Sequence, residues 1–298
     1  MRVLKEAAGS PVSPSAIKLI QKAGYTAIGT DCNSDSFGRY ICDEFYQVPY
    51  ASDPNSADFL AKLVVDNKID LIIPTLDEGM MDWARMAADL KKHDVYVAIS
   101  DLQTIEICQD KWLTYNMFIE NDIPTAKTSL ENIYPLVKPR NGRGSQGIII
   151  NDKSVDMNGM ISQELLSGQE YTIDILCDKD GEPVYIVPRI RTTVKEGKST
   201  EGIVVENDKI VELVKKICKA IKFMGPINIQ CFESSQGEIK FTEINPRLGG
   251  GTVLGIEATE NWFPLIVDTF VYDKKIKADK PVQYGLKMSR YYDEVFYF

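Results

Sequence analysis

The first hundred residues alternate short apolar runs with segments of helical periodicity, and this alternation constrains the fold of the 298-residue chain more than any other feature. The apolar runs lie at residues 1–4, 25–29, 70–74 and 95–99, and the helical segments at residues 14–23, 55–67 and 79–92. Short uninterrupted apolar runs are typical of parallel strands buried on both faces. A helix between two such strands lets them pair in parallel. We therefore predict an open parallel α/β sheet.

The residues around the first two strands argue against nicotinamide binding by this sheet. Only Gly9 occurs where a dinucleotide-binding fold carries its G-x-G-x-x-G fingerprint. Asp31 follows the second strand, where such folds place a ribose-binding acid, but without the glycines it is more typical of a turn or cap. Lys5 and Glu6 put two charges at the end of the first strand, which a buried-strand pattern does not explain.

Asp77 and Glu78 follow the third predicted strand of this sheet. Open α/β sheets bind ligands at the carboxyl ends of their strands. These acids are therefore expected either to face a substrate amine or to help position the rest of the chain. The alternative is that they cap the helix that begins near Gly79 or lie in its first turn.

A second stretch, residues 241–251, carries the strongest chemical signal. It places Glu243, Asn245 and Arg247 within five residues and closes with three glycines. Side chains two apart in a strand leave by the same face, so Glu243 and Asn245 can offer oxygen atoms to one point. Such oxygen ligands suit Mg²⁺. The planar guanidinium of Arg247 can grip a phosphate or carboxylate bidentately; the alternative is a structural arginine paired with Glu257 or Glu260.

The preceding run, residues 227–233, alternates polar and apolar residues and is joined to residues 239–245 by a turn-forming segment, which predicts a hairpin. If Glu233 pairs with Glu238, Asn228 lies opposite Glu243 and Gln230 lies opposite Phe241. Opposed residues share a face, so the polar side chains of both strands would project together. The alternative is an ordinary hairpin whose polar face meets solvent.

Composition excludes several classes of protein. The chain has 44% hydrophobic and 26% charged residues, with no apolar run of the length of a membrane span, and its net charge of −9 opposes binding to nucleic acid or an anionic membrane. The six cysteines lack CxxC spacing and are expected to be reduced thiols. His93 is the only histidine, which argues against Ser-His-Asp catalysis and a multi-histidine metal site. Without a secretion signal, we expect a cytoplasmic protein.

The combination of Asn-Ile-Gln with Glu-Ile-Asn-Pro-Arg resembles the metal and phosphate signature of the ATP-grasp superfamily, particularly its carbamoyl-phosphate-synthase-like branch. The resemblance implies a mixed α/β and α+β fold with three lobes. These are an N-terminal Rossmann-like, parallel-sheet lobe at residues 1–102, a small nucleotide lobe at 103–166 and a larger, metal-bearing lobe at 167–298. It also assigns the metal ligands, which are Gln230, Glu243 and Asn245. The length allows one such unit, whereas a carbamoyl-phosphate synthase large subunit has two.

The same resemblance assigns residues to ATP. Lys111, at the start of a predicted helix, and Lys138, on a predicted strand, would reach the phosphates. Residues 140–147 form a glycine-rich loop that allows close backbone approach to phosphate oxygens. In the ATP-grasp reading this loop covers the phosphates through Gly142, Gly144, Ser145 and Gly147. The adenine hinge would be Gln163, Glu164, Leu165 and Leu166, with Glu170 as the ribose-binding acid.

Three further segments carry predictions. Arg189 and Arg191 share one face of a predicted strand, and at least one of them is expected to bind an anionic substrate group; the alternative is a solvated basic edge. The polar run at residues 192–202 predicts a flexible loop. The aromatic residues 291–298 predict a packed last strand; the alternative is an appended end that is not part of the fold.

We therefore expect an ATP- and Mg²⁺-dependent ligase, with Mn²⁺ as an alternative ion, that activates a carboxylate as an acylphosphate for attack by an amine or similar nucleophile. Arg247 and Lys138 would act in catalysis by neutralising charge on the transferring phosphoryl group. The expected partners are small-molecule substrates rather than nucleic acid or membrane, and a homodimer stays open. The alternatives are a non-catalytic, ATP-binding regulatory protein of the same fold and, less well supported, a Rossmann-type oxidoreductase.

Overall fold

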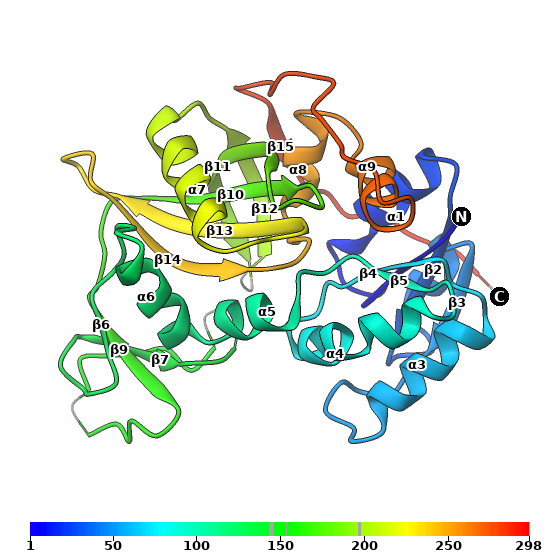
Figure 1. Cartoon of the computed structure of the whole chain (residues 1–298), viewed down its shortest axis with the longest axis horizontal. Helices are drawn as coiled ribbons and strands as arrows, with labels where there is room; N and C mark the ends of the chain where they lie inside the picture. Colours follow the sequence, from blue (N-terminus) through cyan, green and yellow to red (C-terminus); the bar gives the residue numbers. More distant parts are fainter. Residues whose placement is uncertain (143–145, 153, 196–197, 298) are drawn as a thin grey trace.

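Three β-sheets surround a central cleft in the computed structural model, which describes residues 1–142, 146–152, 154–195 and 198–297. The N-terminal sheet lies at the right of Figure 1, the small sheet at the lower left and the largest sheet above them. In the described part of the chain, no helix has both the length and the apolar character that a membrane crossing requires.

The N-terminal sheet is parallel, as the alternation predicts, and its strands follow the order β3-β2-β1-β4-β5. Its elements, in chain order, are β1 (Arg2–Lys5), α1 (Ser13–Lys22), β2 (Thr26–Asp31), α2 (Gly38–Ile41), β3 (Glu44–Gln47), α3 (Ser56–Asp66), β4 (Leu71–Ile73), the 3-10 turn η1 (Asp77–Gly79), α4 (Met80–Lys91) and β5 (Tyr96–Val97). The edge strand β3 and the short helix α2 were not predicted. Asp31 is the last residue of β2, and its carboxylate accepts hydrogen bonds from the backbone N–H groups of Gly9 and Asn33, so it stabilises the loops that follow β1 and β2.

The small sheet is antiparallel, in the order β6-β9-β7-β8. Its strands are β6 (Thr128–Ser129), β7 (Leu136–Pro139), β8 (Ile149–Ile150) and β9 (Met160–Gln163). Two helices precede it, the predicted α6 (Lys111–Glu120) and an unpredicted α5 (Leu102–Gln109). Both helices pack on the largest sheet, as Phe118 of α6 and Phe241 show with ring centroids 5.9 Å apart. The lobe boundaries near residues 102 and 166 remain a proposal.

The largest sheet is antiparallel, in the order β14-β13-β10-β11-β12-β15. Its strands are β10 (Gln169–Cys177), β11 (Pro183–Lys195), β12 (Lys198–Val204), β13 (Gly225–Glu233), β14 (Ile239–Asn245) and β15 (Lys287–Ser289), and the helices α7 (Asp208–Ala220), α8 (Thr252–Glu257) and α9 (Trp262–Phe270) accompany it. One face of the sheet is apolar, because Ile173, Ile229 and Ile244 pack against α5, α6 and α7. The opposite face carries polar side chains into the cleft.

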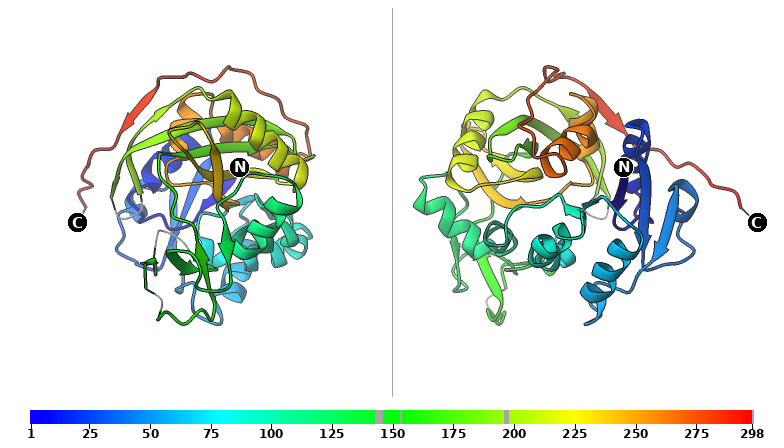
Figure 2. Two further views of the ribbon diagram at one scale, coloured as in Figure 1. Left: turned by 90° about the vertical axis from the view of Figure 1, so that its left-hand side faces the viewer. Right: turned by 45° about the vertical axis from the view of Figure 1, so that its right-hand side comes forward.

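Two predictions about this lobe are wrong. Strands β11 and β12 occupy all the described residues of the segment expected to be a flexible loop, since its threonines and valine pair readily in a sheet. The aromatic end of the chain is not a packed strand: β15 ends at Ser289, and Tyr291, Tyr292 and Phe296 are more than four-fifths exposed. Figure 2 shows this end extending away from the largest sheet, and its one ring contact is the stacking of Tyr297 on Tyr40, among the described residues.

The hairpin of β13 and β14 forms as predicted, but with a different register. Asn228 lies opposite Asn245 and Gln230 opposite Glu243, while Phe241 lies opposite Cys231. The register shifts between these pairs, so β14 has a bulge at Thr242. Two features account for the correction: Glu233 pairs with Ile239 instead of Glu238, which shifts the hairpin by one residue, and the bulge shifts Asn228 and Gln230 by one more. A regular strand would send Phe241 and Glu243 to the same face, whereas the bulge lets Phe241 enter the core and leaves Glu243 in the cleft.

The N-terminal and largest sheets share one continuous core. Ile17 and Ile20 of α1 belong to the same buried cluster as Trp262 and Phe263 of α9. The side-chain amide of Asn261 also donates a 2.8 Å hydrogen bond to the carbonyl of Leu19. These contacts fix the carboxyl edge of the parallel sheet relative to the polar face of the largest sheet.

Candidate active site

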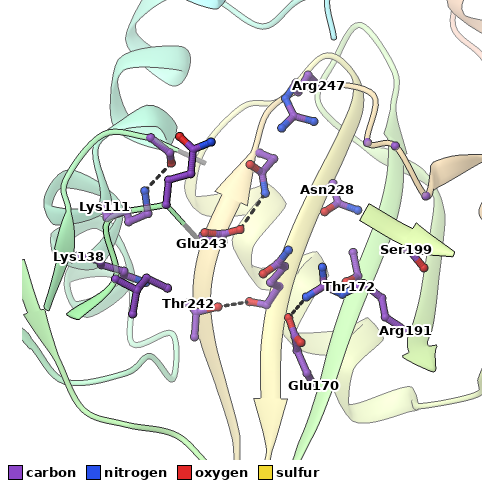
Figure 3. Close-up of a pocket in the computed structure, with 18 of the residues that line it drawn as sticks. Lys111, Lys138, Glu170, Thr172, Arg191, Ser199, Asn228, Thr242, Glu243 and Arg247 are labelled. Atoms are coloured by element: carbon purple, nitrogen blue, oxygen red, sulfur yellow. Dashed lines mark hydrogen bonds and ion pairs between the residues drawn. The ribbon is translucent and has the colours of Figure 1, made fainter. Parts of the chain in front are cut away.

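A cleft of about 850 Å³ opens between the three sheets. Its walls come from the end of β1 and the loop after it, from β7 and β9 of the small sheet, and from β10, β11, β13 and β14 of the largest sheet. Figure 3 shows Lys111 and Lys138 on one side of the cleft, Glu243 between them and the strands, and Arg247 near the end of β14. Segments far apart in the sequence thus supply one site.

The three predicted metal ligands lie together on the polar face of the hairpin. Gln230 and Glu243 are direct neighbours across the strands, and the side-chain amide of Asn245 donates a 3.3 Å hydrogen bond to the Glu243 carboxylate. Asn228, opposite Asn245, extends the polar set. Among the described residues, no group of three or more histidine, cysteine, aspartate or glutamate side chains could hold a metal. One carboxylate with neighbouring amide oxygens nevertheless fits Mg²⁺, which completes its shell with phosphate and water.

Two lysines face this set of oxygen ligands. Lys111 begins α6 and donates a 2.8 Å hydrogen bond from Nζ to the carbonyl of Gly142, so it ties the helix to the start of the glycine-rich loop. Burial lowers the pKa of Lys111, and the negative charge of Glu243 opposes this shift. Burial lowers the pKa of Lys138 to about 8, again against the field of Glu243. An anion that enters the cleft would therefore stabilise both ammonium groups.

The predicted hinge lines the far end of the cleft, where Gln163, Glu164, Leu165 and Leu166 join the small sheet to β10. Gln163 is buried and donates through Nε2 to Thr128 Oγ1 at 2.9 Å. The carboxylate of Glu164 lies 2.7 Å from Nζ of Lys240 and accepts a hydrogen bond from the backbone N–H of Lys127. Leu136 and Ile148 add apolar surface to the same cleft. An apolar wall beside backbone polar groups suits a purine ring.

The glycine-rich loop is only partly described. Gly142 lines the cleft and has a φ of 124°, a conformation that favours glycine. Gly147 also has a positive φ, of 70°, but it does not line the cleft. Gly144 and Ser145, which the resemblance assigns to phosphate binding, lie outside the described residues.

The paired arginines of β11 lie inside the cleft rather than on a solvated edge. Arg189 is 3% exposed and bonds through Nε to Asp174 at 2.6 Å, and Asp174 also accepts from the Asn228 side chain. Arg191 pairs with Glu170, the predicted ribose-binding acid. Both arginines are therefore held by carboxylates of the neighbouring strand β10, and their expected contact with an anionic substrate stays a prediction.

Arg247 is paired across the molecule. Its Nε and Nη2 atoms donate to the two carboxylate oxygens of Asp77 at 2.8 and 2.5 Å. The alternative pairing of Arg247 with Glu257 or Glu260 is thus wrong, because the guanidinium pairs with Asp77 of η1. Asp77 and Glu78 lie in the first turn of η1, directly before α4. Neither acid is an N-cap, because Leu76 is the N-cap of η1 and Gly79 that of α4.

Sequence reasoning missed the contribution of β1 to this cleft. Lys5 lines it although the side chain is only 4% exposed, and burial lowers its pKa to about 8. Its Nζ donates to Ser13 Oγ at 2.7 Å and to the carbonyl of Glu6. The signal in the sequence was the unexplained Lys5-Glu6 pair at the end of an apolar strand. Thr172 and Ser199 also line the cleft and carried no signal.

Two protein-family models match the chain. Residues 10–98 match "PylC-like, N-terminal domain", and residues 156–293 match "ATP-grasp in the biosynthetic pathway with Ter operon". The first match covers most of the parallel sheet. The second covers the largest sheet, including the hairpin with Glu243, Asn245 and Arg247.

Individual proteins are similar at low identity. The carbamoyl phosphate synthase large chain of Methanothermobacter thermautotrophicus is 24% identical over 249 residues, which span 70% of this chain but only 23% of that protein. The biotin carboxylase domain of Hydrogenobacter thermophilus 2-oxoglutarate carboxylase, solved with MgADP, ADP and bicarbonate, superimposes with a TM-score of 0.77 at 15% identity over 96% of this chain and 73% of that one. The L-amino acid ligase of Bacillus licheniformis superimposes with a TM-score of 0.73 at 17% identity, over 93% of this chain and 75% of that one. These structural matches share the fold.

Proposed function

Because the chain carries an ATP-grasp domain behind a PylC-like N-terminal domain and is related to carbamoyl phosphate synthase large chains, we propose that it is an ADP-forming ligase. In the proposed reaction, a carboxylate oxygen attacks the γ-phosphorus of ATP and the bond to the β,γ-bridging oxygen breaks. ADP leaves, and an acylphosphate results. An amine or similar nucleophile then attacks the acyl carbon and phosphate leaves, and an amine gives a product with a new C–N bond.

The observation that carries this proposal is the convergence of three kinds of group in one cleft. The oxygen ligands Gln230, Glu243 and Asn245 lie on one wall, and the ammonium groups of Lys111 and Lys138 face them. Phosphoryl transfer needs positioning and neutralisation of charge more than covalent help from the protein. The Glu243 carboxylate and its neighbouring amides, opposite the ammonium groups of Lys111 and Lys138, supply both.

We assign the roles as follows. The hinge at Gln163 to Leu166 holds the adenine, and Lys111 and Lys138 bind phosphate oxygens. Gln230, Glu243 and Asn245 would hold Mg²⁺, which, when bound, neutralises charge on the phosphates and polarises the transferring group. Arg247 neutralises the charge that develops on that group. The carboxylate and the nucleophile would enter between Arg247 and the end of β1, because Arg247 and Lys5 line the same cleft and offer positive charge to a carboxylate.

The test is a screen for phosphate and ADP release from Mg-ATP with panels of carboxylic acids and amines, alone and in pairs. The proposal expects ADP release that depends on one acid, and a coupled product only when a nucleophile is also present. Hydroxylamine serves as a general nucleophile, because it traps an acylphosphate as a hydroxamate. Tight nucleotide binding without acid-dependent turnover across the panels would contradict a ligase and favour the non-catalytic regulatory alternative.

A further inference from the structure

The ion pair between Arg247 and Asp77 joins residues 170 positions apart in the sequence. Both side chains are largely buried, with 13% of the arginine and 17% of the aspartate exposed. Two parallel N–H···O bonds fix the plane of a guanidinium as well as its position. Asp77 therefore sets the orientation of the arginine that follows the proposed metal ligands, although it lies in η1, beside the N-terminal sheet.

Asp77 is itself held in place by buried polar contacts. The carboxylate of Glu6 accepts hydrogen bonds from the backbone N–H of Thr75 at 2.8 Å and from the indole N–H of Trp83 at 2.7 Å. The side-chain amide of Gln109, at the end of α5, donates to the carbonyl of Asp77. Glu6 thereby fixes the turn between β4 and η1, directly before Asp77. Glu6, a charge that the strand pattern does not explain, thus has a structural role.

Buried contacts join the N-terminal sheet, beside Asp77, to the largest sheet that carries Arg247. The N-terminal and largest sheets share the buried cluster of α1 and α9, and the hydroxyl of Ser100 accepts a 2.9 Å hydrogen bond from the backbone N–H of Met224. A charged pair supported by two packed elements holds one geometry at a smaller entropic cost than a pair of free side chains.

We propose that Asp77 is the positioning residue for Arg247, and that the N-terminal lobe thereby orients the group that acts on the transferring phosphoryl. This inference rests on the proposed ligase function. Asp77 accepts from Nε and Nη2, and the carbonyl of Leu248 lies 3.4 Å from Nη1, so the guanidinium keeps donors for phosphoryl oxygens. The aspartate contributes geometry and does not contact the reacting atoms.

The experiment is a double-mutant cycle on the whole chain with Asp77→Asn, Arg247→Ala and the double variant, measured as ATP turnover with the substrates that the screen identifies. Asp77→Asn keeps the shape but loses the charge and the bidentate acceptor. We expect it to lower kcat by about tenfold or more with little change in the KM for ATP, because the lost orientation matters in the transition state. In the Arg247→Ala background the same change should have no further effect.

Two further variants separate positioning from general damage. Asp77→Glu keeps the charge and should retain more activity than Asp77→Asn. Asp82→Asn is the matched control, since Asp82 is an exposed acid in the neighbouring helix α4 that pairs with Arg85, and it should behave like the wild type. Independent effects that multiply in the double variant would overturn the proposal, as would a loss in Asp77→Asn that appears only in KM.

A wild-type protein that releases no ADP with any substrate would contradict the proposed function instead. The same four proteins then still test the pair, because their free energies of unfolding need no turnover. Non-additive unfolding free energies for the two positions would support the pairing that the inference requires, and additive values would overturn it.

Discussion

The arginines and lysines of the cleft have different surroundings, and this difference suggests different roles. Each of three arginines pairs with a carboxylate: Arg189 with Asp174, Arg191 with Glu170 and Arg247 with Asp77. Lys111 instead donates to backbone carbonyls. An arginine held by a carboxylate has a fixed orientation, whereas a lysine without one gains more from an incoming phosphate. The lysines are therefore suited to bind ground-state ATP and Arg247 to meet a developing charge.

Replacement of Arg247 by lysine tests this distinction. We expect Arg247→Lys to lower kcat by about tenfold or more while the affinity for Mg-ATP changes little, because a point charge replaces a bidentate fork. Nucleotide titration and single-turnover phosphate transfer on the same variant measure the two quantities. Arg85→Lys, an exposed arginine of α4, is the control and should change neither. If affinity and rate fall together, Arg247 binds ATP in the ground state and its assigned role is wrong.

The lowered pKa of Lys138 predicts how nucleotide binding depends on pH. Its pKa in the ligand-free protein is about 8, below the ordinary value of 10.5, because burial disfavours the ammonium. The charge is present below pH 8 and lost above it, so the affinity for Mg-ATP should fall by up to about tenfold per pH unit as the pH rises past 8. Calorimetric titrations of Mg-ATP from about pH 6.5 to about pH 9.5, a range on either side of this pKa, measure the change in affinity.

The effect on folding has the opposite sign. Between pH 8 and 10.5 the unfolded chain keeps the Lys138 proton that the native state has lost, so this residue's contribution to stability increases with pH in that window. Lys138→Met should remove its share of both dependences. A binding profile that is the same in wild type and Lys138→Met would show that Lys138 does not contact the phosphates. Lys111, whose pKa burial also lowers, and Lys5 would then be the remaining candidates for any slope.

At the scale of single elements, the bulge in β14 decides which side chains reach the site. Residue type and spacing predicted the hairpin and the set of polar side chains on it. Phe241 and Glu243, however, are two residues apart, and a regular strand cannot send one to the core and the other to the cleft. The bulge at Thr242 has no glycine to mark it in the sequence. Its position follows from the burial of Phe241 against α6, which is a tertiary contact and not a local signal.

Phe241 therefore anchors the strand that carries the proposed metal ligands. The side chain is fully buried and lies beside Phe118 in the core between β14 and α6. We expect Phe241→Ala to lower the free energy of unfolding by about 3–5 kcal/mol, since it removes a buried ring and leaves a cavity. Denaturant titration measures the change. Phe59→Ala, in the exposed part of α3, should have a far smaller effect, and equal losses in the two variants would contradict the anchoring role.

The parallel strands were predictable because each is a short apolar run bounded by helices. The missed elements lack that contrast. The edge strand β3 carries Glu44 and Gln47 at its ends, so it reads as a polar segment. The aromatic tail was predicted to be a packed strand but is largely exposed. Apolar composition predicts burial only where another surface is available to cover the segment, and β15 already forms the last edge of the sheet.

At the scale of the whole molecule, the cleft is assembled from segments that the sequence separates by more than a hundred residues. The resemblance of the hairpin motif to ATP-grasp proteins predicted which side chains meet there, and the structure brings most of them to one cleft. The pairing of Asp77 with Arg247 and the entry of Lys5 were not predictable, because both depend on how the N-terminal sheet packs on the largest sheet. Local pattern contains no information about that packing.

The proposed function depends most directly on Glu243, the one carboxylate among the assigned metal ligands. The measurement is Mg²⁺-dependent ADP release by wild type and by Glu243→Ala, with Glu257→Ala, an exposed acid of α8, as the control. We predict that Glu243→Ala abolishes turnover while its free energy of unfolding stays near that of the wild type, since the change removes a ligand charge and no core packing. Nearly wild-type, Mg²⁺-dependent turnover in a folded Glu243→Ala protein would contradict the account.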